Sequence, residues 1–528
     1  MLGKIREFIF MKNEKANLQP QIFWVGDTLN DNYFSEVYSA LLQRNLISGY
    51  MSHATNSECG QLEFIDSTLL YTLSGIDHAF PQLNWTYGSS LTIEKLSSIR
   101  SDVYFAIDRI SPNVKTMHYK EMYFNKLAGY FIGFLEKVFI QRVVVQHTPH
   151  MPWDILFCQM AKLADIDVFS VNRVVPGCGV VWSGIGSEGQ MIYLKNHKKE
   201  EGKINFKSAK KGFERKVESV KLVHYEKSRN DNRALKNFTK AVTPRFVKKH
   251  LFLFRHCLAG IPVQYRPATK NTTQCTVLAG EEFVQRKEFF FIIRKYMDHL
   301  GSLKSYMDKN GSVDPDLDAK YAYLPLHCQP ERSTLPEGGI YRDQLVLASR
   351  LREVLPNDYF IYVKEHPKQF NWDLRNKNFR STGFYDELQK IDKLRLIHHT
   401  YSSQKLVGSA RLIATVTGTS AVEALFQGVP ALVFGMSFLD GCDSVVRQKN
   451  DFQINSRSIC GLLEKNTKDV ITDFRRFLEK APWYKICSSA EEWEKCGSKR
   501  EYVDNLIEML IARPDSSGFG AGKPKTLT

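Results

Sequence analysis

The 528-residue sequence lacks the cysteine patterns of a zinc-binding or disulfide-stabilised protein. Its ten cysteines are scattered, and none forms a Cys-x-x-Cys pair or a cluster with histidine. Isolated thiols of this kind argue against structural zinc and are typical of a reducing compartment. No metal-binding cluster of the Asp-x-Asp kind stands out either, so we expect no metal ligands and a metal-independent chemistry.

Long apolar runs are also missing. No uninterrupted apolar stretch approaches the roughly 20 residues of a membrane-spanning helix. Residues 1–11 carry charges and lack the apolar core and cleavage site of a secretory signal. Because 43% hydrophobic and 12% aromatic residues are enough for ordinary cores, we expect a cytoplasmic globular protein.

Acidic residues are few relative to basic ones. The chain has 57 Asp and Glu against 72 Lys and Arg, a formal net charge of +15, which attracts polyanions in general. Basic residues are densest in segment 195–250. Such a segment is usually a solvated helical face, and the alternative is contact with an anionic membrane or with the acceptor of a reaction. In the second case the protein would be peripheral at the inner face of the cytoplasmic membrane.

Outside this segment, strands and helices alternate, which predicts an α/β protein with two doubly wound domains facing a cleft. One domain would hold a donor and the other an acceptor. The sequence divides into an N-terminal α/β domain (1–190), a basic helical connecting segment (191–314), a C-terminal α/β domain (315–470), C-terminal helices (471–512) and a disordered tail (513–528).

The N-terminal domain is expected to contain buried strands at 21–26, 103–107 and 142–146. Polar residues that follow such strands lie at the mouth of the sheet, where ligands bind. Alternatively, an aspartate here caps the next helix and the histidines bond to loop backbone. The candidates are Asp27, His147, His150 and Asp154.

The C-terminal domain places three polar segments after predicted strands, at 327–333, 364–368 and 417–420. The carboxyl ends of parallel strands meet at one edge of a sheet, so we expect these segments to converge. Their basic and polar side chains suit a nucleotide phosphate. The alternative for His366 is an ordinary loop histidine with satisfied hydrogen bonds. The candidates for binding the donor are Gln329, Arg332, Lys364, His366, Pro367, Gly418, Thr419 and Ser420.

The segment 414–434 reads as a strand, a Gly-Thr-Ser turn, a helix and a further strand. Free backbone N–H groups and the helix dipole at such a turn favour an anion. Glu423 lies one turn beyond Thr419 on the same helix face, where it could bond ribose hydroxyls. The alternative for Glu423 is an exposed helical glutamate.

Three motifs resemble the bacterial capsular polysaccharide biosynthesis proteins, a family that includes the β-Kdo transferases of capsule linkers and O-antigens. They are Tyr-Leu-Pro-Leu-His-Cys-Gln-Pro-Glu-Arg-Ser (323–333), Val-Lys-Glu-His-Pro (363–367) and Gly-Thr-x-x-x-Glu-Ala-Leu-x-x-Gly-x-Pro (418–430). The segment Pro-His-Met-Pro-Trp-Asp (149–154) is similar to the N-terminal half of that family. The resemblance is specific between about 320 and 440.

This resemblance implies a glycosyltransferase of GT-B type, with two Rossmann-like domains and a nucleotide-sugar donor, CMP-linked in the Kdo members, held by the C-terminal domain. It assigns CMP contacts to His366 and Pro367. It also implies an acidic nucleophile near the Gln-x-Glu element, here Gln329-Pro-Glu331. Arg332 and Ser333 stand where the capsule-linker enzymes carry two aspartates.

The expected function is transfer of a sugar, Kdo or another CMP-activated ulosonic acid, to a growing capsule or other cell-surface glycan or glycolipid. Glu331 would attack the anomeric carbon with retention of configuration, or else Asp154, His150 or Asp27 would deprotonate the acceptor with inversion. Two other hypotheses stay open: a nucleotide-sugar epimerase, and a non-catalytic polyanion-binding protein. Nucleic acid is not expected as a partner, because the basic segment has few aromatic residues for base stacking.

Overall fold

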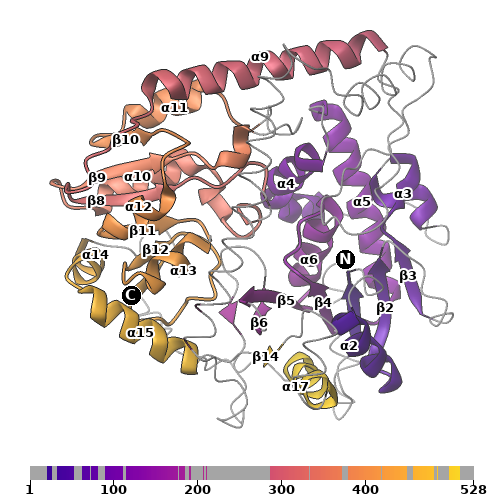
Figure 1. The fold of residues 1–528 in the computed structure, drawn as a ribbon. Coiled ribbons are helices and arrows are strands. Elements are labelled where there is room, and N and C mark those ends of the chain that lie inside the picture. Colours follow the sequence, from indigo (N-terminus) through magenta and orange to yellow (C-terminus); the bar gives the residue numbers. More distant parts are fainter. Residues whose placement is uncertain are drawn as a thin grey trace, which may run out of the picture.

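The computed structural model contains two α/β domains, with a long helix, α9 (Arg286–Asn310), leading into the second (Figure 1). The candidates Asp27, Arg332 and Gly418 lie outside the described residues, as do the tail 513–528 and all but two residues of the basic segment 195–250. The structure describes residues 21–26, 32–52, 62–71, 73–80, 90–110, 115–175, 178–184, 190–191, 206, 210, 286–331, 333–370, 379–417, 419–448, 456–480, 484–485 and 499–511.

The N-terminal sheet is built on parallel strands in the spatial order β3-β2-β1-β4-β5. The chain starts in the middle, moves outward on one side and then crosses to the other, which is the doubly wound arrangement. Beyond β5, the strands β6, β7 and β14 extend the sheet in antiparallel pairs. The strands are β1 (Ile22–Val25), β2 (Ile47–Ser52), β3 (Glu63–Asp66), β4 (Arg142–Gln146), β5 (Asp167–Val175), β6 (Cys178–Ser183), β7 (Gln190–Met191) and β14 (Tyr484–Lys485).

Both faces of this sheet are covered by helices, so β1 and β4 are buried on both sides. Phe23 and Val25 pack into one core with α4, α5 and α6, whereas Ile22 and Trp24 pack into the other with α2 and α17. A strand buried on both faces reads as a continuous apolar run, which is how the sequence revealed it. The helices are α2 (Asn32–Gln43), the 3-10 helix η2 (Leu69–Tyr71), α3 (Leu73–Ala79), α4 (Ser90–Ile110), α5 (Met117–Lys137), α6 (Pro152–Leu163) and α17 (Lys499–Ile511).

The strand expected at 103–107 is wrong, because these residues lie inside the helix α4. Val103, Ala106 and Ile107 are buried, and their spacing places them on one face of a helix. A short apolar run does not by itself distinguish a strand from a buried helix.

The C-terminal helix α17 returns to the N-terminal domain. It lies beside α2 in Figure 1, and Arg44 pairs with Asp504 at 2.5 Å. The guanidinium of the buried Arg142, at the start of β4, donates to the carbonyl of Leu510. The two ends of the described chain therefore belong to one domain.

The C-terminal sheet is parallel throughout, in the order β10-β9-β8-β11-β12-β13. Ala322 and Leu324 of β8 face one core, and Tyr321 and Tyr323 face another on the opposite side. Together the two sheets confirm the predicted fold class. The elements are β8 (Tyr321–Pro325), η4 (Gly339–Arg342), α10 (Gln344–Val354), β9 (Phe360–Lys364), η5 (Pro367–Phe370), α11 (Thr382–Gln389), β10 (Leu394–Ile397), α12 (Ser403–Ser409), β11 (Leu412–Thr415), α13 (Thr419–Phe426), β12 (Ala431–Val433), β13 (Val445–Arg447), α14 (Ser456–Leu463) and α15 (Thr467–Lys480).

The helix α9 runs along the top of the view in Figure 1, above α11. Its last turns belong to the C-terminal domain, because Leu303 and Met307 are buried in that core. Tyr306 stacks on Tyr385 of α11 with ring centroids 5.6 Å apart. The end of α9 is thereby fixed against the C-terminal sheet.

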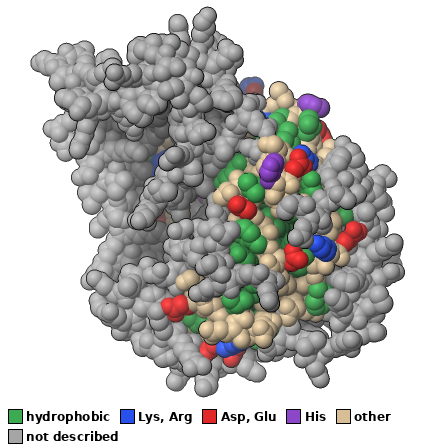
Figure 2. Space-filling model, turned by 90° about the vertical axis from the view of Figure 1, so that its right-hand side faces the viewer, with side chains coloured by type: hydrophobic (Ala, Val, Ile, Leu, Met, Phe, Trp, Pro, Cys, Tyr) green, Lys and Arg blue, Asp and Glu red, His purple; other side chains and the backbone are tan. Residues whose placement is uncertain are grey.

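The described part of the surface on the N-terminal side is chemically mixed. Figure 2 shows acidic and basic side chains interspersed with apolar ones among the coloured residues of this face. None of the helices in the described parts of the chain combines the length and apolar character needed to cross a bilayer.

Candidate functional site

The strand order of the C-terminal sheet has a switch point between β8 and β11. From β8 the chain goes outward through β9 and β10, and it then crosses to β11, β12 and β13 on the other side. The connections after β8 and β11 leave in opposite directions, so a crevice forms at the carboxyl ends of these two strands. His327 lies at this point, and its Nε2 is 3.0 Å from Thr415 Oγ1 at the end of β11.

The loop that follows β8 is held by buried amide side chains. Gln344 Oε1 accepts from His327 N at 2.7 Å, and Gln369 Oε1 accepts from Gln329 N at 2.7 Å. Gln369 Nε2 donates back to the Gln329 carbonyl at 3.1 Å. The Gln329 side chain is itself buried and accepts from Thr334 Oγ1 at 3.2 Å. The structure thus places Gln329 within the support of the loop.

An acidic side chain and two imidazoles gather above this loop. His327 Nδ1 lies 3.3 Å from Ser333 Oγ and 3.6 Å from Glu331 Oε2. Glu331 keeps 48% of its side chain exposed, so a ligand can reach its carboxylate. We call His327, Glu331, Ser333, His366 and Thr415 the switch-point site.

The electrostatics of this site separate a charged carboxylate from a neutral imidazole. The partial shielding of Glu331 from solvent opposes its ionisation, but the hydrogen bond and charge of His327 and the charge of His366 outweigh this effect and lower the pKa of the carboxyl. Burial also lowers the pKa of His366, against the pull of Glu331. Lys368 N donates to His366 Nδ1 at 3.1 Å, so the neutral ring carries its proton on Nε2. At neutral pH the site therefore offers an ionised carboxylate and an imidazole N–H donor.

A buried ion pair lies beneath the site. Arg380 Nε donates to Glu365 Oε2 at 2.7 Å, and the Tyr385 hydroxyl donates to the same oxygen at 2.8 Å. The pair also holds the site backbone, because Glu365 Oε1 accepts from His366 N at 2.8 Å and Arg380 Nη2 donates to the His327 carbonyl at 3.2 Å. The sequence did not identify Arg380 as a support of the site, because no motif near it in the chain indicates that it pairs with Glu365.

The remaining donor candidates lie on neighbouring elements. Lys364, at the end of β9, is buried and donates to Ser403 Oγ at 2.9 Å. Burial, opposed by the charge of Glu365, lowers the pKa of Lys364 to about 8. Pro367 begins η5 directly after His366.

The helix α13 begins beside the switch-point site. It carries Thr419 and Ser420 in its first turn and the half-buried Glu423 one turn later. Just before it, Thr417 Oγ1 donates to the Ser333 carbonyl at 3.0 Å. The turn after β11 and the loop after β8 are therefore joined, as the convergence of strand ends predicted.

The N-terminal domain meets the site region through the loop after β4. Thr148 Oγ1 donates to Glu337 Oε1 at 2.6 Å, and His150 Nδ1 lies 3.3 Å from the Thr148 carbonyl. His147, in the same loop, has a positive φ of 77° and packs edge-on against Phe34. Glu337 was not singled out from the sequence, although it lies close after the Gln-x-Glu element.

Asp154 lies in the first turn of α6, behind this loop. Burial raises the pKa of Asp154 to about 7, against opposing backbone hydrogen bonds from Met151 and His150 and the charge of Arg109. Arg109 reaches across the domain boundary, where its Nη1 donates to the Leu335 carbonyl at 2.8 Å. A carboxyl that titrates near pH 7 suits a general base.

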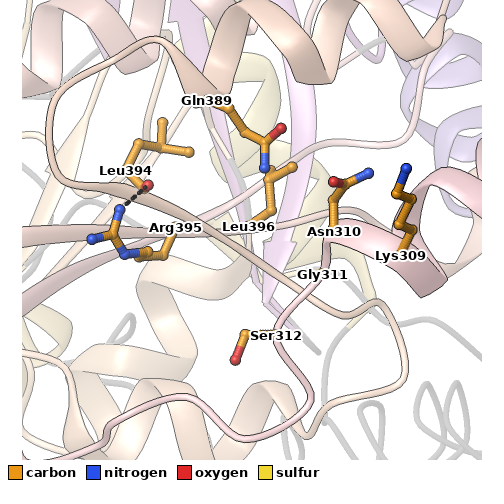
Figure 3. A pocket seen from close by; sticks show the side chains of 8 residues that line it. All are labelled: Lys309, Asn310, Gly311, Ser312, Gln389, Leu394, Arg395 and Leu396. Carbon is orange, nitrogen blue, oxygen red and sulfur yellow. Dashed lines mark hydrogen bonds between the residues drawn. The ribbon is translucent and has the colours of Figure 1, made fainter.

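A surface hollow of about 360 Å³ lies elsewhere, along the outer edge of β10 (Figure 3). It contains no residue of the switch-point site, and we place the candidate site at the strand ends because the chemically distinctive groups converge there. The hollow is lined by Lys309, Asn310, Gly311, Ser312, Gln389, Leu394, Arg395 and Leu396.

The fold and the site define a doubly wound α/β protein with a polar site at the switch point of its second sheet. Residues 338–457 match the family model described as capsule polysaccharide biosynthesis protein. The resemblance inferred from the motifs is thereby confirmed over this segment, where the chain is similar to capsule polysaccharide biosynthesis proteins. The matched segment contains the 363–367 and 418–430 motifs and begins just after the 323–333 motif.

No curated protein matches the chain. Among solved structures, it is similar to the beta Kdo 2,7 transferase KpsC of Thermosulfurimonas dismutans, with 12% identity over 64% of this chain and 85% of that chain and a TM-score of 0.24. It is also similar to the UDP-GlcNAc 2-epimerase of Methanocaldococcus jannaschii, with 14% identity over 92% and 99% of the two chains and a TM-score of 0.19. Because both TM-scores are low, the assignment rests on the family match.

Proposed function

We propose that this protein is a glycosyltransferase of capsule or other cell-surface polysaccharide synthesis. The observation that carries the proposal is the switch-point site, where the ionised Glu331 lies beside His327 and close to the neutral His366, next to the segment that matches the family model. The donor is a nucleotide sugar, in our proposal a CMP-linked ulosonic acid such as Kdo. The acceptor is a growing glycan or glycolipid that enters from the N-terminal domain.

In this proposal His366 and the first turn of α13 bind the donor phosphate. The Nε2–H of His366 donates to a phosphate oxygen, and the helix N-terminus of α13 favours the negative charge that develops as the nucleotide leaves. Lys364 adds a positive charge at the end of the neighbouring strand. These groups stabilise the departing phosphate without requiring a metal ion.

Glu331 is the proposed nucleophile. A carboxylate oxygen forms a bond to the anomeric carbon while the bond from that carbon to the nucleotide phosphate breaks, and the nucleotide departs with the electron pair. An acceptor hydroxyl then attacks the same carbon, Glu331 leaves, and the hydroxyl proton passes to a base. Asp154 or His150 of the N-terminal domain is the proposed base.

A pair of variants tests these roles. Glu331→Gln should keep nucleotide affinity and lower turnover on the order of 10³-fold or more, because it removes the nucleophile. His366→Ala should instead weaken nucleotide binding by roughly tenfold, the effect of one hydrogen bond to a charged group. Isothermal titration with CMP, UDP and GDP, followed by product analysis, measures both effects. Glu353→Gln, on the exposed face of α10, is the control.

The stereochemical outcome decides the mechanism. Retention, with a donor-derived mass adduct on Glu331 in the absence of acceptor, supports the covalent route. Inversion would exclude it and leave Asp154, His150 or Asp27 as the base of a direct displacement. Conversion of the donor into an epimer without any acceptor would overturn the transferase proposal itself.

A further inference from the structure

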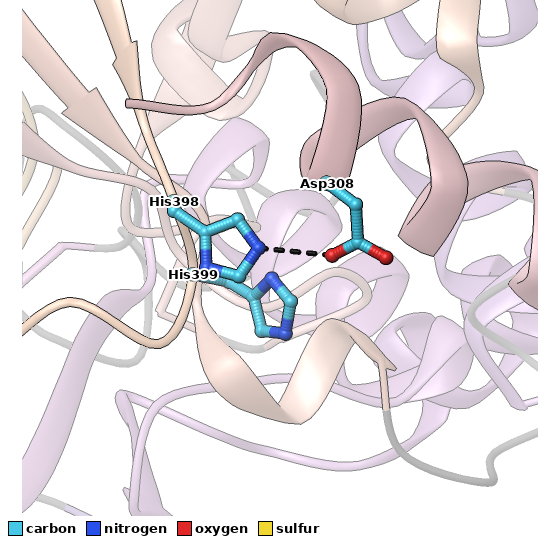
Figure 4. A group of neighbouring side chains, drawn as sticks. All are labelled: Asp308, His398 and His399. Atoms are coloured by element: carbon cyan, nitrogen blue, oxygen red, sulfur yellow. Dashed lines mark hydrogen bonds and ion pairs between the residues drawn. The ribbon is translucent and has the colours of Figure 1, made fainter. Parts of the chain in front are cut away.

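We propose that Asp308, His398 and His399 form a binding site for a divalent transition-metal cation of the zinc class, at the carboxyl end of β10. This inference is independent of the proposed transferase function, because none of these residues belongs to the switch-point site. Figure 4 shows the three side chains facing one another, with Asp308 on the last turn of α9 and the two histidines directly after β10.

The ligand atoms are already close together. All three lie within 4.8 Å of one another, and His398 Nε2 is 2.9 Å from Asp308 Oδ1. A tetrahedral zinc ion bound at about 2.0–2.2 Å requires ligand atoms about 3.4 Å apart. The Asp308 side chain is 66% exposed, so it can rotate by the small amount that is needed.

The backbone brings the two segments together independently of any ion. His398 N donates to the Ser312 carbonyl and Ser312 N donates to the Leu396 carbonyl, both at 2.9 Å. A Cβ on Gly311 would lie 3.0 Å from His398 Cα and 2.7 Å from the Met307 carbonyl. Glycine at this position therefore allows the end of α9 to approach the end of β10 closely.

The outer contacts also suit a metal ligand. His398 Nδ1 lies 2.7 Å from Thr400 Oγ1 and 3.4 Å from Thr400 N. With Nε2 on a metal ion, the Nδ1–H would donate to this hydroxyl, the type of second hydrogen bond that orients a metal-binding imidazole. The ring of His399 packs on Phe370 at 4.4 Å, and its Nδ1 is buried without a hydrogen-bond partner in the described structure. A buried ring nitrogen in this state is costly unless another group satisfies it, and a cation would do so.

The donor set selects the class of cation. Two imidazoles and one carboxylate suit zinc and its neighbours, whereas magnesium and calcium prefer oxygen ligands alone. The exposed side of Asp308 leaves a fourth position open to water. The positive charges of Lys304 and Lys364 act on His399 and oppose a cation, so we expect moderate affinity.

A bound ion would tie the end of α9 to the loop after β10. Through Phe370 this loop contacts η5, which directly follows His366. The ion would therefore stabilise the edge of the sheet next to the donor site and would take no part in the chemistry.

Metal titration of the full-length, chelator-treated protein tests the proposal. We expect one equivalent of Zn²⁺ to bind and to raise the melting temperature, and Co²⁺ to give the visible absorption of a tetrahedral site. Thr400→Val should weaken binding by about tenfold, as loss of an outer hydrogen bond does. Asp308→Asn and His399→Ala should weaken it further.

Matched controls exclude non-specific binding. Asp298→Asn changes the same charge on the same helix, and His118→Ala removes an exposed histidine of α5, so both should bind like the unmodified protein. Circular dichroism verifies that every variant is folded. Absence of stoichiometric binding, or equal affinity in Asp308→Asn, His399→Ala and the two controls, would overturn the proposal.

Discussion

Replacing Glu365 by glutamine should destabilise the C-terminal domain strongly. The side chains of Glu365 and Arg380 are 0% and 4% exposed, and they form a hydrogen-bonded pair at 2.7 Å. Removing one partner leaves an uncompensated buried charge on the other, which costs about 3–5 kcal/mol. Glutamine retains the shape of the side chain and one acceptor oxygen, so we expect a loss of stability at the lower end of this range, about 3 kcal/mol.

The effect should also reach the switch-point site. Glu365 accepts from the backbone of His366, and Arg380 donates to the carbonyl of His327. Loss of the pair removes a support from both histidines. Nucleotide binding by the folded fraction of Glu365→Gln should therefore decrease as well, although Glu365 touches no proposed ligand.

Urea unfolding read out by hydrogen exchange of β8 and β9 measures this loss. This readout follows the affected domain, which is necessary because two domains can unfold in separate steps. Glu353→Gln is the control, since its pair with Arg350 at 2.7 Å leaves 62% of the glutamate side chain exposed and should contribute less than about 1 kcal/mol. The double variant Glu365→Gln/Arg380→Met should recover part of the stability. A loss no greater than that of the control would refute the reasoning.

Two further predictions concern charge. Burial raises the pKa of Asp154 from 3.8 to about 7, so the stability that this carboxyl contributes is fully present below about pH 4 and is lost as the pH rises through 7. Asp154→Asn should therefore have a larger free energy of unfolding than wild type at about pH 8, by at most about 4 kcal/mol, and the difference should vanish near pH 4. Thermal melting at both pH values measures it, and a difference independent of pH would contradict this prediction. The basic segment 195–250 should bind anionic vesicles in co-sedimentation, by up to about 1 kcal/mol per basic residue near the surface, and release them at high salt. Equal binding to neutral vesicles would exclude this role.

The sequence predicted the parallel strands well because they are buried on both faces. The stretches at 142–146 and 412–416 each contain three consecutive apolar residues, and each forms a strand whose carboxyl end is followed by candidate site residues. The convergence of the loops after β8, β9 and β11 follows from this pattern. By contrast, β2 contains Ser48 and Gly49 and was not recognised, since its strand character depends on its neighbours in the sheet.

The supports of the site could not be predicted, because they pair residues that are far apart in the chain. Gln344 and Gln369 are ordinary polar residues in sequence, yet their buried amides hold the loop after β8. The same is true of Asp308 and His398, which are 90 positions apart and meet only after α9 folds onto β10. Sequence spacing finds ligands that lie on one local element, and it misses those that the tertiary fold brings together.

The two domains are joined by hydrogen bonds close to the proposed nucleophile. Thr148 and Arg109 of the N-terminal domain bond to Glu337 and Leu335, only a few residues beyond Glu331 in the same loop region. Two of the proposed bases lie next to this contact, His150 in the loop after β4 and Asp154 at the start of α6. Because the charge of Arg109 acts on Asp154 while its guanidinium crosses the boundary, ionisation of Asp154 is linked to that contact. Proton transfer and the approach of the two domains are thus physically coupled in the proposed mechanism.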